Sequence, residues 1–241
     1  VPSSTNRDLV YHFHGRHGAA FSWNDRNYYT GGIHAAWLEL GIAPPTVVTV
    51  SFGPVWFLTH RPDQPNGGLY RIFLDHVLAR VEKEIPHPIG RRMMNGESMG
   101  GMNALMATLR TEHPFVKVAS LCPPVQTISP WAPFSEFFRY VRRTSTTAHR
   151  AFLMWGFTRQ YYPTVEVWRG NDPLELAKIY RQPPNVSLYV NCGARDDWGC
   201  MDGTKAMISA IEQNGGRVEW NPRPGGHCDI DVKSVAQFLS N

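Results

Sequence analysis

Short apolar runs rich in β-branched residues recur along this chain, and stretches with helical periodicity lie between them. Four runs are prominent and two are weaker: Leu9–Phe13, Thr46–Ser51, Lys117–Cys122 and Val186–Cys192, then Arg92–Asn95 and Arg217–Trp220. The prominent runs are continuous rather than alternating, which is typical of strands covered on both faces in a parallel sheet. The alternation of strands with helices predicts an α/β fold with right-handed crossovers.

The helices can be placed from their apolar spacing. In Leu69–Ile85 the apolar residues recur every three or four positions, and Pro86 ends the helix. The same spacing predicts helices over 203–213 and 230–239, and a further helix over 103–110 follows the glycine pair at 100–101. Each predicted helix connects two predicted strands or follows the last one, as a crossover architecture requires.

Residues 123–184 break this rhythm. The segment has many aromatic side chains, several prolines and basic residues, and it is too long and too apolar for a plain loop. We interpret it as a helical, cap-like insertion over one end of the sheet, with an ordinary peripheral helical layer as the alternative. The sequence shows no repeats and no low-complexity linker, so we predict a single domain over residues 1–241.

Composition limits the classes of function. Hydrophobic residues make up 42% and charged residues 18% of the chain, which are globular proportions and exclude a disordered tail or a coiled coil. No run approaches the roughly 18 apolar residues that a membrane span needs. The net charge of +4 is small and spread along the chain, with doublets only at 91–92 and 142–143. We therefore expect no nucleic-acid partner, because that would need clustered positive charge.

The motif Gly-x-Ser-x-Gly occupies residues 96–100, between a predicted strand and a predicted helix. A tight strand-to-helix turn exposes the serine hydroxyl at the sheet edge, and the small residues on either side let the backbones pass. This context predicts Ser98 as a nucleophile. The alternative is an unreactive glycine-rich turn.

A serine hydroxyl needs a base to become a good nucleophile at neutral pH. Among ten histidines, His227 lies in a Gly-Gly-His segment between the last predicted strand and the last helix. That position fits the chain order of nucleophile, acid and histidine in enzymes with this motif. We predict His227 as the base.

The base needs a carboxylate to orient it. The strand ending at Cys192 is followed by Asp196 and Asp197, which are adjacent and would point in different directions, and Asp202 lies a little further on. We favour Asp196, with Asp197 and then Asp202 as alternatives. Trp198, beside the acid, is expected to help line the substrate site.

The loop after the first strand reads His-Gly-Arg-His-Gly from residue 14 to residue 18. Such a loop places a backbone amide opposite the nucleophile turn. We predict an oxyanion hole made by the amides of Met99 and Arg16, and we expect His14 to contact substrate. The alternative is a plain turn that ends the strand.

Several segments, taken together and in order, resemble one enzyme group: HFHG at 12–15, GESMGG at 96–101, NDPLELA at 171–177, CGARD at 192–196 and GGH at 225–227. They are similar to the esterase D group of α/β-hydrolases, which includes feruloyl and acetyl-xylan esterase-like enzymes, S-formylglutathione hydrolase and mycolyl-transferases. The resemblance implies an α/β-hydrolase fold and a triad of Ser98, Asp196 and His227, with the Gly-x-x-Asp spacing favouring Asp196. Only eight residues precede the first strand, so we expect the two antiparallel strands common at the start of this fold to be absent.

The cysteines bear on the compartment. Cys122 and Cys192 each end an apolar run, and we interpret them as buried free thiols. Cys200 and Cys228 lie in loops that we expect to meet, so a Cys200–Cys228 disulfide is an alternative to free thiols. That disulfide would favour a secreted or periplasmic location over the cytoplasm. The first residue is Val1, from which we expect a processed or excised chain.

The leading functional prediction is a serine esterase that cleaves carboxylic esters through an acyl-enzyme. The same residues would serve an acyltransferase or a thioesterase, and a non-catalytic binding protein with this fold is a further alternative. The substrate is expected to be a small-molecule or polysaccharide-linked ester, with an apolar or aromatic group suggested by the insertion. No metal or organic cofactor is implied, and the oligomeric state is left open.

Overall fold

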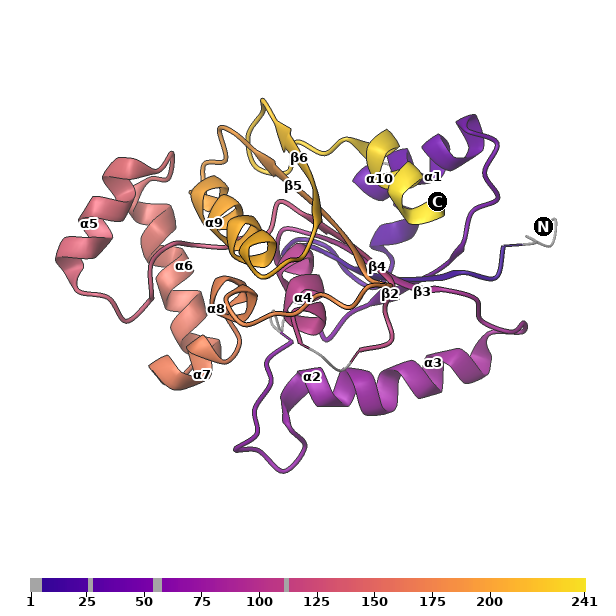
Figure 1. Cartoon of the computed structure of the whole chain (residues 1–241), viewed down its shortest axis with the longest axis horizontal. Helices are drawn as coiled ribbons and strands as arrows, with labels where there is room; N and C mark the ends of the chain where they lie inside the picture. Colours follow the sequence, from indigo (N-terminus) through magenta and orange to yellow (C-terminus); the bar gives the residue numbers. More distant parts are fainter. Residues whose placement is uncertain (1–5, 26–27, 54–57, 111–112) are drawn as a thin grey trace.

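The computed structural model describes residues 6–25, 28–53, 58–110 and 113–241. Six strands form one sheet in the order β2-β1-β3-β4-β5-β6 (Figure 1). Their bounds are β1 Leu9–Phe13, β2 Thr46–Val50, β3 Arg92–Glu97, β4 Lys117–Leu121, β5 Ser187–Gly193 and β6 Val218–Arg223. Each lies on one of the predicted runs, so the α/β prediction is confirmed.

All five strand pairings are parallel. Within the described residues no antiparallel strand precedes β1, as the sequence analysis expected. Parallel strands end at the same edge of a sheet, so the loops that follow β1, β3, β5 and β6 meet at one edge.

Both faces of the sheet are covered by helices (Figure 1). On one face α1 (Tyr29–Glu39) and α10 (Val232–Ser240) pack together, and Val10 and Met93 contribute to the core there. Tyr11 and Phe13 point to the opposite core, because successive residues of a strand alternate between faces. That core lies under α2 (Gly68–Ile72), α3 (Leu78–Glu84), α4 (Met99–Thr108), α8 (Pro173–Ala177) and α9 (Cys200–Gln213).

The predicted helix over Leu69–Ile85 is present with a change of pitch in its middle. It begins as α2 (Gly68–Ile72), passes through one π-helical segment, η2 (Phe73–Val77), and continues as α3. The segment ends at Glu84, and Ile85 is extended because it precedes Pro86. A short 3-10 helix, η1 (Ser22–Asn24), lies in the loop after β1.

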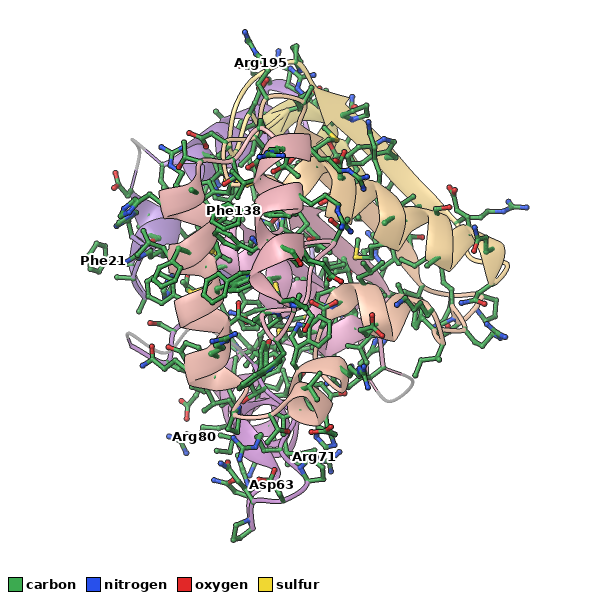
Figure 2. The ribbon with its side chains drawn as sticks, turned by 90° about the vertical axis from the view of Figure 1, so that its left-hand side faces the viewer. Phe21, Asp63, Arg71, Arg80, Phe138 and Arg195 are labelled. Carbon is green, nitrogen blue, oxygen red and sulfur yellow. A yellow bond between two sulfur atoms is a disulfide. The ribbon has the colours of Figure 1, made fainter. Side chains whose placement is uncertain are left out.

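The aromatic-rich segment 123–184 contains helices of two kinds. α5 (Phe134–Arg143) and α6 (Ala148–Tyr161) pack on each other through Phe137, Tyr140 and Trp155 and lie at one end of the molecule, with α7 (Val165–Arg169) following them (Figures 1 and 2). α8 instead packs into the main core through Leu176 and Ala177. We call α5 and α6 with their connection the α5–α6 hairpin.

The structure corrects the cysteine pairing. Cys122 forms a disulfide with Cys228, across 106 residues of sequence and a Cα–Cα distance of 5.1 Å. The prediction of a free thiol at Cys122 and the Cys200–Cys228 alternative are both wrong, because Cys200 begins α9 and is buried there as a free thiol. Cys192 is a buried free thiol, as predicted.

In the part of the chain that the structure describes, no helix combines the length and the apolar character needed to cross a membrane.

Candidate active site

Ser98 lies in a sharp turn between β3 and α4. Its φ of +53° is in a region that residues other than glycine rarely adopt, and its amide donates to the Leu121 carbonyl at 2.8 Å. The glycines of the motif make this turn possible. A Cβ on Gly100 would lie 1.9 Å from the Phe13 carbonyl oxygen, and one on Gly96 would lie 2.3 Å from the oxygen of Gly100. The sequence therefore folds into a turn that presents the serine side chain at the sheet edge.

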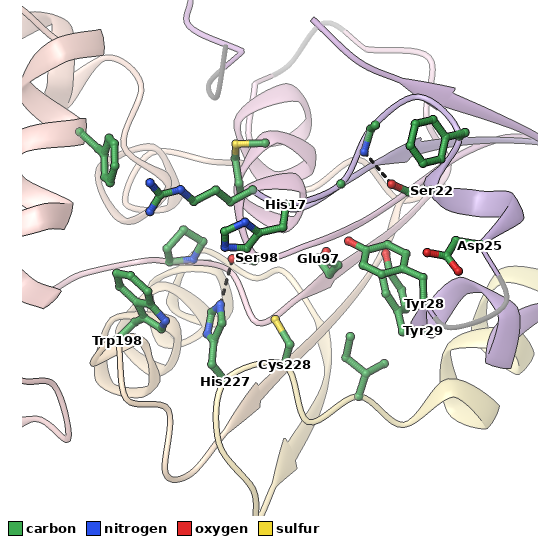
Figure 3. Close-up of a pocket in the computed structure, with 18 of the residues that line it drawn as sticks. His17, Ser22, Asp25, Tyr28, Tyr29, Glu97, Ser98, Trp198, His227 and Cys228 are labelled. Carbon is green, nitrogen blue, oxygen red and sulfur yellow. Dashed lines mark hydrogen bonds between the residues drawn. The ribbon is translucent and has the colours of Figure 1, made fainter. Parts of the chain in front are cut away.

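His227 lies in the loop between β6 and α10, and its Nε2 is 2.9 Å from Ser98 Oγ (Figure 3). The loop is held from two directions. The neighbouring Cys228 is bonded to Cys122 at the end of β4. The Asn191 side-chain amide, buried in β5, donates to the Asp229 carbonyl at 2.7 Å. These bonds fix the histidine relative to the strands that carry the other site residues.

Asp196 completes a continuous row of hydrogen bonds. Its Oδ2 accepts from His227 Nδ1 at 2.7 Å and its Oδ1 accepts from the Trp198 amide at 2.8 Å, and the residue is completely buried. Asp197 points away, with 45% of its side chain exposed, and forms an ion pair with Arg150. Asp202 is exposed in the first turn of α9. Of the three candidate acids, Asp196 is the one that contacts His227.

Two buried thiols lie beside this acid. Cys192 Sγ is 3.8 Å from Asp196 Oδ2, and the Cys200 sulfur lies within 4.8 Å of the Asp196 and His227 ligand atoms. Burial, with the nearby Asp196 charge, raises the pKa of Cys192 to about 12, and burial also raises the pKa of Cys200. Both sulfurs are therefore protonated at neutral pH and surround the carboxylate with weak donors rather than charges.

The loop after β1 faces Ser98 from the other side. Glu97, adjacent to the serine, is buried and its Oε1 accepts from the Gly15 amide at 3.0 Å. Burial raises the pKa of Glu97 to about 7, opposed by that hydrogen bond and by His227. A Cβ on Gly15 would lie 2.2 Å from the carboxylate, so glycine is needed for this contact. Glu97 thus connects the serine turn to the loop that contains Arg16.

Met99 is the first residue of α4, where a backbone amide has no partner within its own helix. Met99 and Arg16 both line the cavity that contains Ser98. The Arg16 guanidinium lies 4.6 Å from the centre of the Phe157 ring of α6. The two residues predicted for the oxyanion hole therefore both lie at the cavity that contains the serine.

His14 is placed differently from its prediction, because it does not line this cavity. It is buried, with Nδ1 2.7 Å from the Gly15 carbonyl and Nε2 2.9 Å from Ser51 Oγ. The carbonyl can only accept, so Nδ1 carries the proton and Nε2 accepts from the serine hydroxyl when the ring is neutral. The side chain braces the loop rather than reaching toward the cavity.

The cavity around Ser98 has a volume of about 490 Å³ and extends to both sides of the serine (Figure 3). On one side Trp198, with Met154 and Phe157 of α6, supplies apolar lining, and the Arg16 guanidinium lies against the Phe157 ring. The other side has polar groups at its end, with Tyr28 and Asp25 beyond Glu97. The Trp198 ring centre is 6.2 Å from that of His227, so this residue lies where the sequence analysis expected it.

Two groups of possible metal ligands occur among the described residues, and both include His227. In the first, the sulfurs of Cys122 and Cys228 are bonded to each other and cannot bind a cation. In the second group, which also includes Cys200, a bound metal would break the hydrogen bond between Asp196 and His227.

Three features of the site were not predicted from the sequence: the contact of Glu97 with Gly15, the position of the Cys192 and Cys200 thiols beside Asp196, and the polar end of the cavity. Glu97 is the variable second residue of the serine motif, so the motif itself carried no signal for its contact with Gly15. For the disulfide that holds the His227 loop, the sequence did carry a signal, because Cys228 directly follows His227.

The sequence matches the family described as "Putative esterase" over residues 2–218. The chain belongs to this esterase family. No curated protein sequence matches it. As a family member with a parallel sheet flanked by helices, the protein is a carboxylic ester hydrolase with the α/β-hydrolase fold, and the predicted resemblance is confirmed.

Solved structures with the same fold are distant in sequence. The esterase is similar to a ferulic acid esterase (TM-score 0.61, 19% identity, covering 98% of this chain and 86% of the other). It is also similar to an S-formylglutathione hydrolase from Agrobacterium tumefaciens (TM-score 0.64, 15% identity, covering 98% of this chain and 81% of the other). A third similar structure is that of a bacterial brefeldin A esterase, a homologue of human hormone-sensitive lipase (TM-score 0.67, 18% identity, covering 98% of this chain and 69% of the other). At these identities the similarity shows the fold of the esterase.

Proposed function

We propose that the esterase cleaves its ester through an acyl-enzyme formed on Ser98, with His227 as general base and Asp196 as the residue that orients it. The observation that carries this proposal is the continuous hydrogen-bonded row from Ser98 Oγ through the imidazole to a fully buried carboxylate, with distances of 2.9 and 2.7 Å. Three residues that are distant in sequence form this row at one sheet edge.

In the first step, His227 Nε2 takes the proton of Ser98 while Oγ attacks the ester carbonyl. The carbonyl oxygen becomes negative, and we propose that the amides of Met99 and Arg16, which both line the cavity, donate to it. One such donor typically lowers the barrier by about 3–4 kcal/mol. The imidazolium then gives its proton to the departing alkoxide, and the alcohol leaves the acylated serine.

In the second step, water takes the place of the alcohol. His227 removes a proton from the water, hydroxide adds to the acyl carbon, and the protonated ring returns the proton to Ser98 Oγ as the acid is released. Asp196 keeps Nδ1 protonated and stabilises the imidazolium that forms in each half of the cycle.

The shape of the cavity supports a substrate with an apolar or aromatic group on one side of its ester bond. Trp198, Met154 and Phe157 line that side. α6 supplies two of these residues, and we propose that the α5–α6 hairpin acts as a cap on a single α/β-hydrolase domain. A small-molecule or polysaccharide-linked ester remains the proposed substrate class.

A fluorophosphonate probe tests the nucleophile directly. We expect the probe to label the wild-type protein and a peptide containing Ser98, and to leave Ser98→Ala unlabelled. A panel of p-nitrophenyl esters of rising chain length, with hydroxycinnamate and acetyl-sugar esters, then identifies the preferred group. Labelling of Ser98→Ala at the wild-type rate would refute the proposal.

A further inference from the structure

The α5–α6 hairpin exposes large aromatic side chains to solvent. Phe134 is 66% exposed, Phe138 55%, Phe152 60% and the preceding Trp131 40%. We call these four residues the aromatic face. Figure 2 shows Phe138 on the outer side of the hairpin, toward the viewer. Several large exposed rings on one hairpin are typical of a surface that binds something apolar.

The same hairpin is strongly basic. Helices α5 and α6 with their connection contain five arginines and one glutamate, a net charge of +4 that equals the net charge of the whole chain. The excess of positive charge is therefore concentrated on this hairpin. The expectation that it is spread along the chain was wrong. Phe134, Phe138 and Arg142 are spaced four residues apart and share one stripe of α5.

On α6, Phe152 and Arg159 are exposed, and the Arg159 guanidinium lies 4.9 Å from the centre of the Trp131 ring. The exposed rings are mostly phenylalanine, which has no hydrogen-bonding group to compensate for its exposure to water. Arginines around apolar rings are the composition of helices that lie in the boundary of an anionic bilayer.

The position of the hairpin links this surface to the cavity. Met154 and Phe157 of α6 line the cavity around Ser98, whereas Phe152 of the same helix points to solvent. α6 therefore stands between the aromatic face and the apolar side of the cavity. A lipid surface that covers the aromatic face would lie beside the side of the cavity where we place the apolar group of the substrate.

We propose that the aromatic face docks on an anionic lipid–water interface, with the rings inserted among the acyl chains and the arginines on the headgroups. The esterase would then take esters of amphiphilic molecules held in that interface. The docking itself does not depend on the proposed role of Ser98, and only the choice of substrate rests on it.

The test is co-sedimentation of the full chain with sucrose-loaded vesicles of phosphatidylcholine, with or without phosphatidylglycerol. We expect tight binding to the anionic vesicles, at least about tenfold weaker binding to neutral ones, and release by salt. Phe134→Ser/Phe138→Ser should weaken binding about tenfold or more. The matched control Leu38→Ser/Ile179→Ser replaces exposed apolar residues elsewhere (60% and 75% exposed) and should bind like wild type.

The charge contribution has its own control. Arg142→Gln/Arg143→Gln should weaken binding to anionic vesicles about fivefold per removed charge, whereas Arg80→Gln/Lys83→Gln on α3 should not. Equal binding by the test and control variants would overturn the proposal, as would the absence of binding to any vesicle. Concentration-dependent dimers that are lost in Phe134→Ser/Phe138→Ser, without vesicle binding, would assign the aromatic face to a second copy instead.

Activity separates this proposal from that for the catalytic row. Phe134→Ser/Phe138→Ser should hydrolyse a short soluble p-nitrophenyl ester like wild type but lose about tenfold on an ester presented in anionic vesicles. Ser98→Ala should bind vesicles like wild type and hydrolyse neither substrate. Loss of the soluble activity in the phenylalanine variant, at an unchanged Tm, would contradict a docking role.

Discussion

The sheet edge and the α5–α6 hairpin differ in which side chains they expose to water: the sheet edge buries polar groups, and the hairpin exposes apolar rings. At the sheet edge, Asn191 and Asp196 are completely buried, and each has hydrogen-bond partners in the loop that follows β6. On the hairpin, apolar rings such as Phe134 and Phe138 remain in solvent. A polar group can be buried at low cost only when it is bonded, and an apolar ring is exposed at a cost unless something covers it.

The difference suggests a division of roles in the esterase. The partnered groups at the sheet edge hold one geometry and would supply the chemistry. The hairpin contributes apolar area and charge and would select where the chemistry takes place. Variants of the first kind should therefore change turnover on every ester, and variants of the second kind should change it only for esters at a lipid surface.

The largest expected effect is at Ser98. Ser98→Ala should lower kcat on a soluble p-nitrophenyl ester by about 10⁵-fold or more, because no acyl-enzyme can form. The fold should be retained, since the small side chain keeps the turn, and circular dichroism and Tm measurements check this. If Ser98→Ala keeps more than a tenth of the wild-type kcat, the sheet edge does not carry the chemistry and the division of roles fails.

A slightly smaller effect is expected at the acid. Asp196→Asn should lower kcat by about 10³–10⁴-fold, because an amide at this position favours the wrong tautomer of His227. Asp197→Asn is the matched control on the adjacent, solvent-exposed residue and should change kcat less than about twofold. Steady-state kinetics on one soluble ester measure both variants. A reversal of the two effects would transfer the orienting role to Asp197.

The disulfide is expected to matter mainly for stability. Cys122→Ala/Cys228→Ala should lower the free energy of unfolding by about 2–4 kcal/mol, because the bond closes a loop of more than a hundred residues in the unfolded chain. Urea denaturation with and without reductant measures it. Reductant should destabilise the wild type toward the value of the variant and leave the variant unchanged. Equal stability of the variant and the oxidised wild type would contradict the prediction.

The fold could be predicted because it depends on patterns that are local in sequence. Each apolar run, such as Leu9–Phe13, is a strand, and Pro86 marks a real helix end. Ser98 could be found for the same reason, since strand, glycine turn and helix follow one another directly.

The remaining features depend on which loops meet in space, and no local pattern encodes this. The cysteine pairing was wrong because the partner of Cys228 lies 106 residues away, at the end of β4. His14 looked like a substrate contact from its place in the loop, but its ring turns toward Ser51. The concentration of charge is different, because all five arginines of the hairpin lie within residues 134–161 and the net charge was counted over the whole chain instead of over this stretch.

The smallest expected effect concerns Glu97, a buried carboxyl whose pKa is raised to about 7. In the unfolded chain an ordinary glutamate titrates near pH 4.5, so the folded protein binds more protons between these values and loses stability as the pH rises from about 4.5 to about 7. The side-chain amide introduced by Glu97→Gln does not ionise. The stability of Glu97→Gln relative to wild type should therefore increase by about 1–3 kcal/mol between about pH 5 and about pH 8.

Asp172 provides the matched control for Glu97→Gln, because its pKa is also raised to about 7 by burial and it does not line the cavity. Asp172→Asn should show the same pH trend in urea denaturation with unchanged kcat/KM, whereas Glu97→Gln should also alter kcat/KM through the Gly15 loop. If the stability difference for Glu97→Gln is the same at both ends of this pH range, the carboxyl is ionised throughout it. The sheet edge would then hold a second buried carboxylate charge, beside Ser98, in addition to that of Asp196, and the partner that compensates it would be the Gly15 amide.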